Sequence, residues 1–362
     1  MKDVGPRALG HRYGPSMRAL ILYGPGDLRL AEIPTPEPGQ GEIVVAVDAA
    51  LTCATDAKML SRGTHPSLGP LPAPFGHEGA GMVVAIGDGA HGISVGDAVV
   101  VANSAPCGRC EWCVRGREGL CEQITYLTGM FAEFIRVPAA IVAHNVMVRP
   151  PDLAPELAAL AEPVACGVRA AARSAARAGE SVVVLGGGLQ GQVLCAVLAR
   201  RGCQVILCDP HLEHRASARR MGAWRVDDAP RDAAGLARVL AQTPGRRGAH
   251  ATFAAVGDAR VWESAVALTR PGGEVNFHGG PAPDDVLRLP ASRLHYEEIT
   301  LQASYHHTPT AIRQAVAMIA DEPELFASLL GPEIGLEEVA DALVSGGPKR
   351  IVRPRHSPTG PA

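Results

Sequence analysis

The stretch Ser181–Asp209, SVVVLGGGLQGQVLCAVLARRGCQVILCD, decides the fold of this chain. Val182–Leu185 is a short apolar run, which is typical of a strand buried on both faces of a parallel sheet. Glycines follow with G-x-G-x-x-G spacing, then a helix-like segment over 192–201, and then a second apolar strand over 204–208 that leads to Asp209. A lone glycine pattern also occurs in ordinary turns, but this order of elements predicts a dinucleotide-binding unit.

Each glycine of the loop has a physical role in holding a pyrophosphate. Gly186 permits a tight turn, Gly188 lets the backbone approach the phosphates, and Gly191 lets the helix pack close to the strand. The N-terminus of the helix adds free N–H groups and the positive end of the helix dipole. The expected cofactor-binding residues are Gly186, Gly188, Leu189, Gln190, Gly191, Asp209 and Arg215.

The acid at the end of the second strand favours NAD(H) over NADP(H). Asp209 can accept hydrogen bonds from both ribose hydroxyls of NAD and would repel the 2′-phosphate of NADP. His211, His214 and Arg215 follow closely and could offset part of this repulsion.

Composition is that of a globular enzyme with ample core. A length of 362 residues suggests two domains, and a net charge of −3 with a pI near 6.5 excludes the basic footprint of a nucleic-acid-binding protein. No apolar run approaches the length of a membrane span, so no membrane partner is expected. The nine cysteines, without a secretory signal, indicate thiols and metal ligands in the reducing cytoplasm.

The elements along the chain predict two domains of different type. Residues 1–16 are rich in Gly, Pro and Arg and are expected to form a disordered leader. Strand-rich sequence punctuated by Gly and Pro predicts a β-barrel-like domain over 17–165. Alternating strands and helices over 166–299 predict a doubly wound parallel sheet, and residues 300–362 are expected to return to the first domain. The fold class is therefore α/β.

Four cysteines with close spacing form the most specific local pattern. Cys-x-x-Cys turns aim thiolates at one centre, and four thiolates give the closed tetrahedral shell of a structural zinc. Free thiols, a disulfide and an iron–sulfur cluster are the alternatives, but nothing else in the sequence indicates electron transfer. The four residues are Cys107, Cys110, Cys113 and Cys121.

A second set of possible ligands is scattered over the first domain. Cys53 follows an apolar strand, His77 precedes another, and Glu162 lies where the two domains meet in the sequence. Each has an ordinary alternative, namely a buried thiol, a hydrogen-bonded core histidine and a helix-capping carboxylate. Together they offer the mixed ligand set of a catalytic zinc that keeps one position open.

These motifs, in this order, resemble those of the zinc-dependent medium-chain alcohol dehydrogenases. The resemblance covers residues 17 to about 353 and is greatest to the polyol (sorbitol/L-iditol) and threonine dehydrogenase branch. It implies a GroES-like β-barrel catalytic domain and a Rossmann domain, with the active site in the cleft between them. It rests on Cys53-x-Thr55-Asp56, Gly76-His77-Glu78-x-x-Gly81, the cysteine lobe, Glu162-Pro163 and the glycine loop.

The resemblance assigns a role to each matching residue. Cys53, His77 and Glu162 correspond to ligands of a catalytic zinc, and Glu78 to a neighbouring carboxylate that can reach the metal or lie behind it. Thr55 corresponds to the hydroxyl that takes the proton of the alcohol, and Asp56 would orient His77. The alternative to metal binding is that Glu162 only begins the following helix, where its negative charge interacts favourably with the helix dipole.

Two positions depart from the pattern of the family. Lys58 stands where relatives often carry a proton-relaying histidine, so the relay uses this lysine or water, or Lys58 is only a surface charge. His306 and His307 stand near the place of an Arg-Tyr pair that holds substrate hydroxyls in similar polyol dehydrogenases. They are expected to hold substrate or to serve the structure.

The implied activity is NAD-linked hydride transfer between a secondary alcohol and its ketone. The expected substrate is a small polar polyol, sugar or amino alcohol, because aromatic residues are scarce at 4% of the chain. A threonine dehydrogenase-like or aminocyclitol enzyme is the nearest alternative, and a non-catalytic nucleotide-binding zinc protein is a different one. The resemblance also implies one catalytic and one structural Zn²⁺ and a homodimer or homotetramer.

Overall fold

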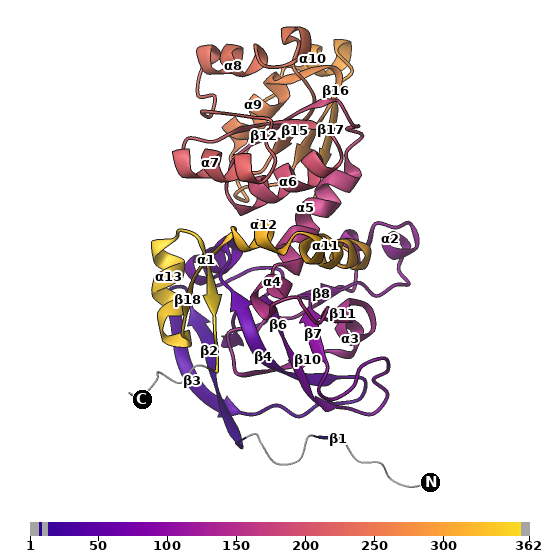
Figure 1. Cartoon of the computed structure of the whole chain (residues 1–362), viewed down its shortest axis with the longest axis vertical. Coiled ribbons are helices and arrows are strands. Elements are labelled where there is room, and N and C mark those ends of the chain that lie inside the picture. The colour runs from indigo at the N-terminus through magenta and orange to yellow at the C-terminus, as the bar shows by residue number, and fades with distance from the viewer. Residues whose placement is uncertain (1–6, 9–13, 356–362) are drawn as a thin grey trace. The chain divides into compact units, whose positions relative to one another are not determined.

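The first strand of the dinucleotide-binding stretch lies at the centre of a six-stranded sheet. The structure, a computed structural model, describes residues 7–8 and 14–355 (Figure 1). The chain divides into two units. Pro163–His307 forms the unit that contains this sheet, and Met1–Glu162 together with Thr308–Ala362 forms the other.

The sheet of the Pro163–His307 unit is parallel throughout. Its strand order is β14-β13-β12-β15-β16-β17. Strands β13 and β14 therefore lie on one side of β12, and the later strands β15 to β17 lie on its other side, so the strand order reverses between β12 and β15. Ligands of such sheets bind outside the carboxyl ends of the strands at this reversal. The strands are β12 (Ser181–Leu185), β13 (Gln204–Cys208), β14 (Arg225–Asp227), β15 (Ala249–Ala254), β16 (Thr269–Phe277) and β17 (Thr300–Ala303).

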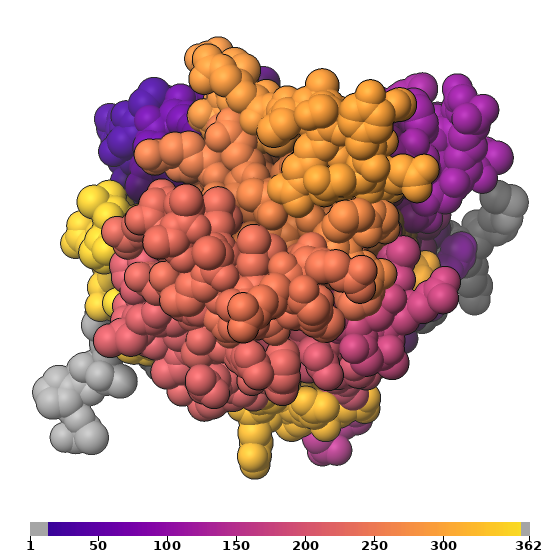
Figure 2. All heavy atoms as spheres, turned by 90° about the horizontal axis from the view of Figure 1, so that it is seen from above, coloured from indigo at the N-terminus to yellow at the C-terminus, as the bar shows by residue number. Residues whose placement is uncertain are grey.

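Helices bury the central strands of this sheet. Val182 and Val183 point to opposite faces and are both fully buried, as the continuous apolar run predicts. Val183 belongs to the cluster that includes Val239 of α8 and Val266 of α9. The helices are α5 (Ala161–Arg173), α6 (Leu189–Arg200), α7 (Leu212–Arg220), α8 (Ala233–Leu240), α9 (Ala259–Ala267) and α10 (Ala291–Tyr296), with a 3₁₀ turn over Pro244–Arg246. Figure 2 views this unit from the end that carries α8 and α10, with its atoms coloured by residue number.

The other unit is built mainly on antiparallel strands. Its largest sheet has the order β11-β7-β6-β4-β19-β18, with β1 paired to β6 and β10 to β4. Two smaller sheets are β3-β2-β5 and β8-β9. The strands are β1 (Arg7–Ala8), β2 (Ser16–Gly24), β3 (Asp27–Pro34), β4 (Ile43–Leu51), β5 (Ala73–Pro74), β6 (Glu78–Ile86), β7 (Ala98–Val101), β8 (Ser104–Ala105), β9 (Thr125–Tyr126), β10 (Phe134–Val137), β11 (Val146–Val148), β18 (Leu330–Ile334) and β19 (Lys349–Val352).

The C-terminal segment completes this antiparallel unit. Strand β19 pairs with β4, and Val352 is buried in the same cluster as Val45 and Phe75. The helices are α1 (Ala54–Arg62), α2 (Glu111–Val114), α3 (Ala139–Asn145), α4 (Pro155–Ala159), α11 (Pro309–Asp321), α12 (Pro323–Ala327) and α13 (Val339–Ser345), with 3₁₀ turns over Glu118–Leu120 and Leu336–Glu338. None of the described helices has the length and apolar character needed to cross a bilayer.

Two local features were not among the sequence expectations. Helix α5 begins at Ala161, and Pro163 stands in its first turn, where the missing N–H of proline costs no helix hydrogen bond. Within the expected leader 1–16, Arg7–Ala8 pairs with Ile86 and Ala85 of β6, and Ser16 begins β2. Residues 1–6 and 9–13 of that leader lie outside the described residues.

The glycine loop after β12 offers a matched pair of substitutions. A Cβ on Gly191 would lie 1.8 Å from the Gly186 carbonyl oxygen, whereas a Cβ on Gly188 would meet nothing within 4 Å. We expect Gly191→Ala to lower the free energy of unfolding by about 1–3 kcal/mol, because backbone atoms must move to relieve the overlap. Gly188→Ala should leave it nearly unchanged. Equal denaturation curves for the two variants would contradict this packing.

Candidate functional site

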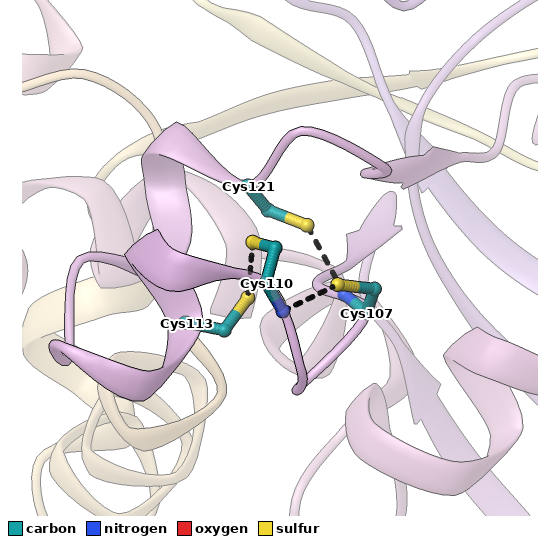
Figure 3. Close-up of side chains that lie close together, drawn as sticks. All are labelled: Cys107, Cys110, Cys113 and Cys121. Atoms are coloured by element: carbon teal, nitrogen blue, oxygen red, sulfur yellow. Dashed lines mark hydrogen bonds between the residues drawn. The ribbon is translucent and has the colours of Figure 1, made fainter.

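Four thiols converge in the loop between β8 and β9. The Sγ atoms of Cys107, Cys110, Cys113 and Cys121 all lie within 4.8 Å of one another (Figure 3). Gly108 and Gly116 have φ of 71° and 69°, which glycine adopts without strain, and allow the chain to turn around the cluster. No cysteine of the described chain is in a disulfide.

Backbone N–H groups already point at the sulfurs. The N–H of Cys110 donates to Cys107 Sγ at 3.4 Å, and the N–H of Cys107 donates to Cys121 Sγ at 3.2 Å. The N–H groups of Arg109 and Cys110 lower the pKa of Cys107 to about 6. Burial, together with the Cys110 side chain, raises the pKa of Cys113 to about 12. A bound cation would neutralise thiolates that lie this close together, so the cluster fits a four-thiolate metal site.

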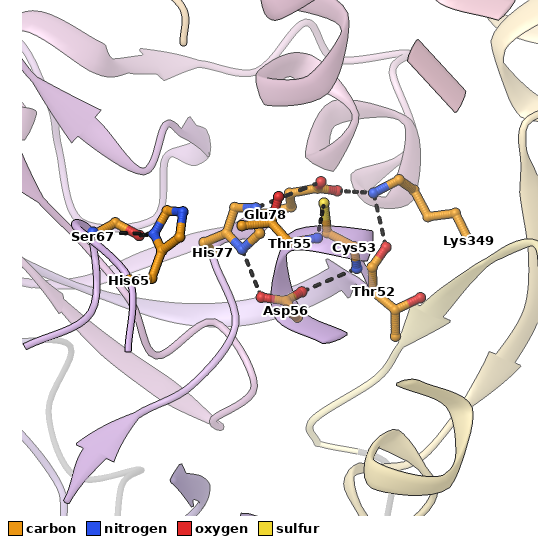
Figure 4. Close-up of polar contacts among 9 residues, drawn as sticks. All are labelled: Thr52, Cys53, Thr55, Asp56, His65, Ser67, His77, Glu78 and Lys349. Carbon is orange, nitrogen blue, oxygen red and sulfur yellow. Dashed lines mark hydrogen bonds and ion pairs between the residues drawn. The ribbon is translucent and has the colours of Figure 1, made fainter. Parts of the chain in front are cut away.

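A second cluster lies where β4 ends and β6 begins. Cys53 is the N-cap of α1, and His77 and Glu78 stand at the start of β6. Ligand atoms of these three residues lie within 4.8 Å of one another. Figure 4 shows their side chains turned toward a common region.

The Asp56 carboxylate contacts both Cys53 and His77 of this cluster. Its Oδ2 accepts from the Cys53 N–H at 3.0 Å, which closes a capping box at the start of α1. Its Oδ1 lies 2.7 Å from His77 Nδ1. The carboxylate therefore holds a proton on Nδ1, so Nε2 is the ring nitrogen whose lone pair can bind a metal.

Asp56 and Cys53 also influence the protonation of His77. Burial opposes charge on the ring, but Asp56 and then Cys53 outweigh it and raise the pKa of His77 well above its usual value. A bound cation at Nε2 would take the place of that proton.

Lys349 of β19 is a part of this site that the sequence analysis missed. Its Nζ pairs with Glu78 Oε2 and donates to the Thr52 carbonyl oxygen at 2.9 Å. Burial opposes its charge, but Glu78 outweighs this effect and raises the pKa of Lys349. No sequence pattern links a lysine to a glutamate 271 residues away. Only the pairing of β19 with β4 brings them together.

The cluster fits a divalent cation with mixed ligands. Glu78 Oε1 is buried with no hydrogen-bond partner among the described residues and lies 3.9 Å from His77 Nε2. A buried oxygen of this kind is costly unless a cation or donor meets it. Thiolate, imidazole and carboxylate are ligands that zinc accepts.

Glu162 stands apart from this three-residue group. It is buried in the first turn of α5, and its carboxylate is not among the atoms that converge with Cys53. The structure thus places one of the two expected glutamates, Glu78, at the cluster. Direct binding by Glu162 remains a prediction.

Two further predicted site residues lie in α1, shortly after Cys53 in the sequence. Thr55 is half-buried, and its N–H donates to Cys53 Sγ at 3.4 Å (Figure 4). Lys58 is exposed one turn further along the helix. Thr55 is therefore the better placed of the two to meet a substrate at the cluster.

The glycine loop of the other unit has the geometry of a phosphate cradle. Gly186 has a φ of 102°, and Gly188 is the N-cap of α6 with open space where its Cβ would stand. Leu189 and Gln190 form the first turn of α6, so N–H groups of this turn have no partner within the helix. Such a helix terminus attracts anions.

Asp209 is buried behind this loop. It accepts from the N–H groups of Gly187 at 2.6 Å and His211 at 2.8 Å, and its Oδ1 lies 3.0 Å from His214 Nδ1. The carboxylate therefore anchors the glycine loop, and its binding of a ribose stays a prediction. Arg215 is half-buried in α7.

The expected His-His pair follows β17. His306 has a φ of 66°, which is uncommon for a residue with a side chain, and His307 is buried. Arg169 of α5 donates to the carbonyl oxygens of Tyr305 and His306, the latter at 3.3 Å. This contact helps to hold the turn in its unusual conformation.

Family profiles match both units of the chain. The profile of the alcohol dehydrogenase GroES-like domain matches residues 39–147, and that of the zinc-binding dehydrogenases matches residues 191–321. The folds and profiles define a zinc- and nicotinamide-dependent oxidoreductase with a GroES-like and a Rossmann unit. More narrowly, the chain belongs to the zinc-dependent medium-chain alcohol dehydrogenase family, with similarity to its polyol and threonine branch.

Named relatives place the chain within this family. Sorbitol dehydrogenase of Bacillus subtilis (strain 168) is 27% identical over 92% of this chain and 94% of its own length. L-threonine 3-dehydrogenase of Pyrococcus horikoshii is 34% identical over 57% of this chain and 60% of its own.

Solved structures agree on the fold. Alcohol dehydrogenase of Thermotoga maritima has a TM-score of 0.86 at 23% identity and covers 94% of this chain and 100% of its own. A zinc-binding dehydrogenase of Sinorhizobium meliloti 1021, bound to NADP, has a TM-score of 0.84 at 26% identity and covers 94% and 99%.

The two clusters predict two zinc ions per chain with different lability. A chelator should first remove the zinc of the Cys53 cluster, because that site keeps an open position, while the four-cysteine site retains its metal. Cys110→Ser should lose one zinc and unfold at lower temperature, since structural zinc contributes folding free energy. Metal analysis and thermal denaturation measure both effects.

Cys203→Ser is the matched control, because Cys203 is a buried thiol outside both clusters that donates to the Arg177 carbonyl oxygen. It should keep two zinc ions. A wild-type chain with one zinc or fewer, or a Cys110→Ser variant with two, would contradict the prediction.

Proposed function

We propose that this protein is an NAD-linked dehydrogenase that interconverts a secondary alcohol and a ketone of a small polar substrate. The observation that carries this is the Cys53–His77–Glu78 cluster, with Thr55 in the adjoining helical turn. Its Glu78 Oε1, buried with no hydrogen-bond partner among the described residues, supports a metal-dependent rather than a purely structural role. The substrate class is a polyol, sugar or amino alcohol.

In this proposal, zinc supplies a Lewis acid that lowers the pKa of the alcohol, and NAD(H) carries the hydride. Cys53, His77 and Glu78 would hold the metal, and Glu162 would be a further carboxylate ligand. Asp56 keeps the proton on His77 Nδ1, which orients the ring. Thr55 Oγ1 takes the proton from the substrate hydroxyl and passes it outward through water or Lys58.

Residues of the other unit hold the cofactor and contribute to substrate binding. The first turn of α6 binds the pyrophosphate, and Asp209 binds the adenosine ribose. His306 and His307 provide hydrogen bonds to substrate hydroxyls, and the strained φ of His306 supports a functional rather than an ordinary turn.

An amino alcohol is the second candidate substrate. Several relatives with 34–35% identity are L-threonine 3-dehydrogenases. A turnover screen over polyols, amino alcohols and their ketones separates the two candidates. A chain that binds zinc and nucleotide but turns over none of them would be the non-catalytic protein instead.

Thr55 provides the test of the proton route. Thr55→Ala should lower kcat about 10²–10⁴-fold, the usual contribution of a positioned acid–base group, because the hydroxyl proton then has no acceptor. Thr55→Ser keeps a hydroxyl and should retain most of the activity. Steady-state kinetics on the best substrate of the screen measures both, and equal losses in the two variants would refute the proton-transfer role.

Asp209 provides the test of cofactor choice. Wild type should have the higher kcat/KM with NAD, and Asp209→Ser should narrow this preference by about tenfold, equivalent to about 1.4 kcal/mol of lost discrimination. Asp232→Ser removes a charge from the same unit at the N-cap of α8, where serine also caps well, and should change nothing. A wild-type preference for NADP would contradict the role of Asp209.

A further inference from the structure

The loop between α1 and β5 carries a histidine, His65, whose ring is held in one orientation. The Leu68 N–H donates to the His65 carbonyl oxygen at 3.0 Å, and Pro66 stands at the second position of this turn, where its fixed φ is favourable. The Ser67 N–H donates to His65 Nδ1 at 3.2 Å, and Ser67 Oγ lies 2.7 Å from the same atom. The His65 side chain is therefore held by hydrogen bonds within its own turn.

Packing at both ends fixes this loop on the antiparallel unit. Gly63 ends α1 with a φ of 67°, and a Cβ at this position would lie 2.8 Å from Pro25, so the chain there runs close to the turn after β2. Beyond the histidine, Leu68 and Leu71 pack against the hydrophobic core of the unit. The position of His65 is thus set by the fold before any ligand binds.

The contacts of the turn decide which ring nitrogen carries the proton. A backbone N–H can only donate, so His65 Nδ1 must accept from Ser67, and the proton of the neutral ring lies on Nε2. Burial lowers the pKa of His65, and the charges of His77 and Arg62 add to this effect. The ring is therefore neutral at pH 7 and presents one N–H donor, at Nε2.

The Nε2 side of the ring faces the cluster of Cys53, His77 and Glu78. Figure 4 shows the ring between Ser67 and His77, with Nδ1 turned to Ser67 and the other nitrogen on the side of His77. Charge on His77 acts on the half-buried ring, which agrees with this placement. The hydrogen bonds of His65 in the part of the chain that the structure describes all use Nδ1 or the backbone. A ligand oxygen can therefore replace water as the acceptor of Nε2–H.

The chemistry of this donor indicates which substrate group it accepts. In the proposed reaction one substrate oxygen meets the metal and Thr55, so a group on the adjacent carbon also lies beside the cluster. A hydroxyl oxygen there can accept from the Nε2–H of His65, whereas an ammonium group has no lone pair and finds no acceptor on this ring. A site that donates to an oxygen discriminates against a ligand that lacks one.

We propose that His65 Nε2–H donates a hydrogen bond to the substrate hydroxyl on the carbon next to the one that is oxidised. This inference rests on the proposed dehydrogenase function and deepens it, because the donor selects polyols with neighbouring hydroxyls over amino alcohols. His65 is then a specificity-determining residue that touches the substrate.

Steady-state kinetics with three small alcohols tests this contact on the full-length, zinc-loaded protein with NAD⁺ at pH 7. 2-Butanol has no neighbouring polar group, 2,3-butanediol has a neighbouring hydroxyl, and 3-amino-2-butanol has a neighbouring ammonium. Wild type should have its highest kcat/KM with the diol. The diol advantage, which is the kcat/KM of the diol divided by that of 2-butanol, is the quantity to compare between variants.

His65→Asn is the matched variant, because the asparagine oxygen can still accept from the Ser67 N–H while the side chain lacks Nε2. It should lower the diol advantage about five- to tenfold, the usual effect of one hydrogen bond. The loss should arise mainly from a higher KM for the diol, with 2-butanol unchanged. His91→Asn changes an exposed histidine of the loop after β6 and should keep the diol advantage of wild type.

Binding calorimetry adds a readout that does not depend on turnover. Protein loaded with NADH cannot oxidise an alcohol, so the titration reports affinity alone. Wild type should bind 2,3-butanediol about five- to tenfold more tightly than His65→Asn does, whereas the two proteins should bind 2-butanol equally.

The outcomes that overturn the inference are distinct from those that overturn the function. A diol advantage that is absent in wild type or unchanged in His65→Asn, or equal diol affinities of the two NADH-loaded proteins, refutes the contact while oxidation of other alcohols persists. A wild-type protein that oxidises no alcohol of the wider screen refutes the dehydrogenase function itself, and the inference with it. Should His65→Asn fail to fold, His65→Phe, which keeps a ring without nitrogen atoms, decides the matter by the same two measurements.

Discussion

The hydrogen bonds of one buried carboxylate, that of Asp56, fix the geometry of the metal cluster. One oxygen closes the capping box at Cys53, and the other holds the imidazole of His77. The side chain is fully buried, so neither bond competes with water. Cys53 is the N-cap of α1 and His77 precedes β6, so the capping box that starts helix α1 also aligns two ligands from different elements. The position of Thr55, in the same first turn of the helix, follows from this arrangement.

The ammonium group of Lys349, far along the chain in β19, balances the negative charge of Glu78 in the cluster. Lys349 pairs with Glu78 inside the unit, and both side chains are almost completely buried. Removing one partner of such a pair leaves an uncompensated buried charge, which typically costs about 3–5 kcal/mol. The second oxygen of Glu78 has no hydrogen-bond partner in the part of the chain that the structure describes and lies 3.9 Å from His77 Nε2, so the ammonium and a metal can share one carboxylate. The return of the C-terminal segment to the antiparallel unit therefore completes the site as well as the sheet.

Local patterns in the sequence were sufficient to predict the fold class and the convergence of the four cysteines. The strand before the glycine loop and the Cys-x-x-Cys turns depend on neighbours within a few residues, so spacing alone reveals them. Lys349 could not be predicted in this way, because only the pairing of β19 with β4 brings it to Glu78 over a long sequence separation. Glu162 is an intermediate case: its position in the first turn of α5 agrees with a helix-capping role and does not by itself decide between that role and metal binding. The substrate is harder still, since it depends on a few side chains rather than on the fold.

The central claim is that this chain holds two metal centres of different chemistry. X-ray absorption at the zinc edge of the fully loaded protein tests the two ligand sets directly. Five thiolates shared between two ions predict an average of about 2.5 sulfur neighbours per zinc at about 2.3 Å, with the remaining neighbours being nitrogen or oxygen at about 2.0–2.2 Å. After partial removal of zinc by a chelator, the average should rise toward four sulfurs, because the mixed site empties first. A sulfur count that falls on chelation, or that is four from the start, would contradict the claim.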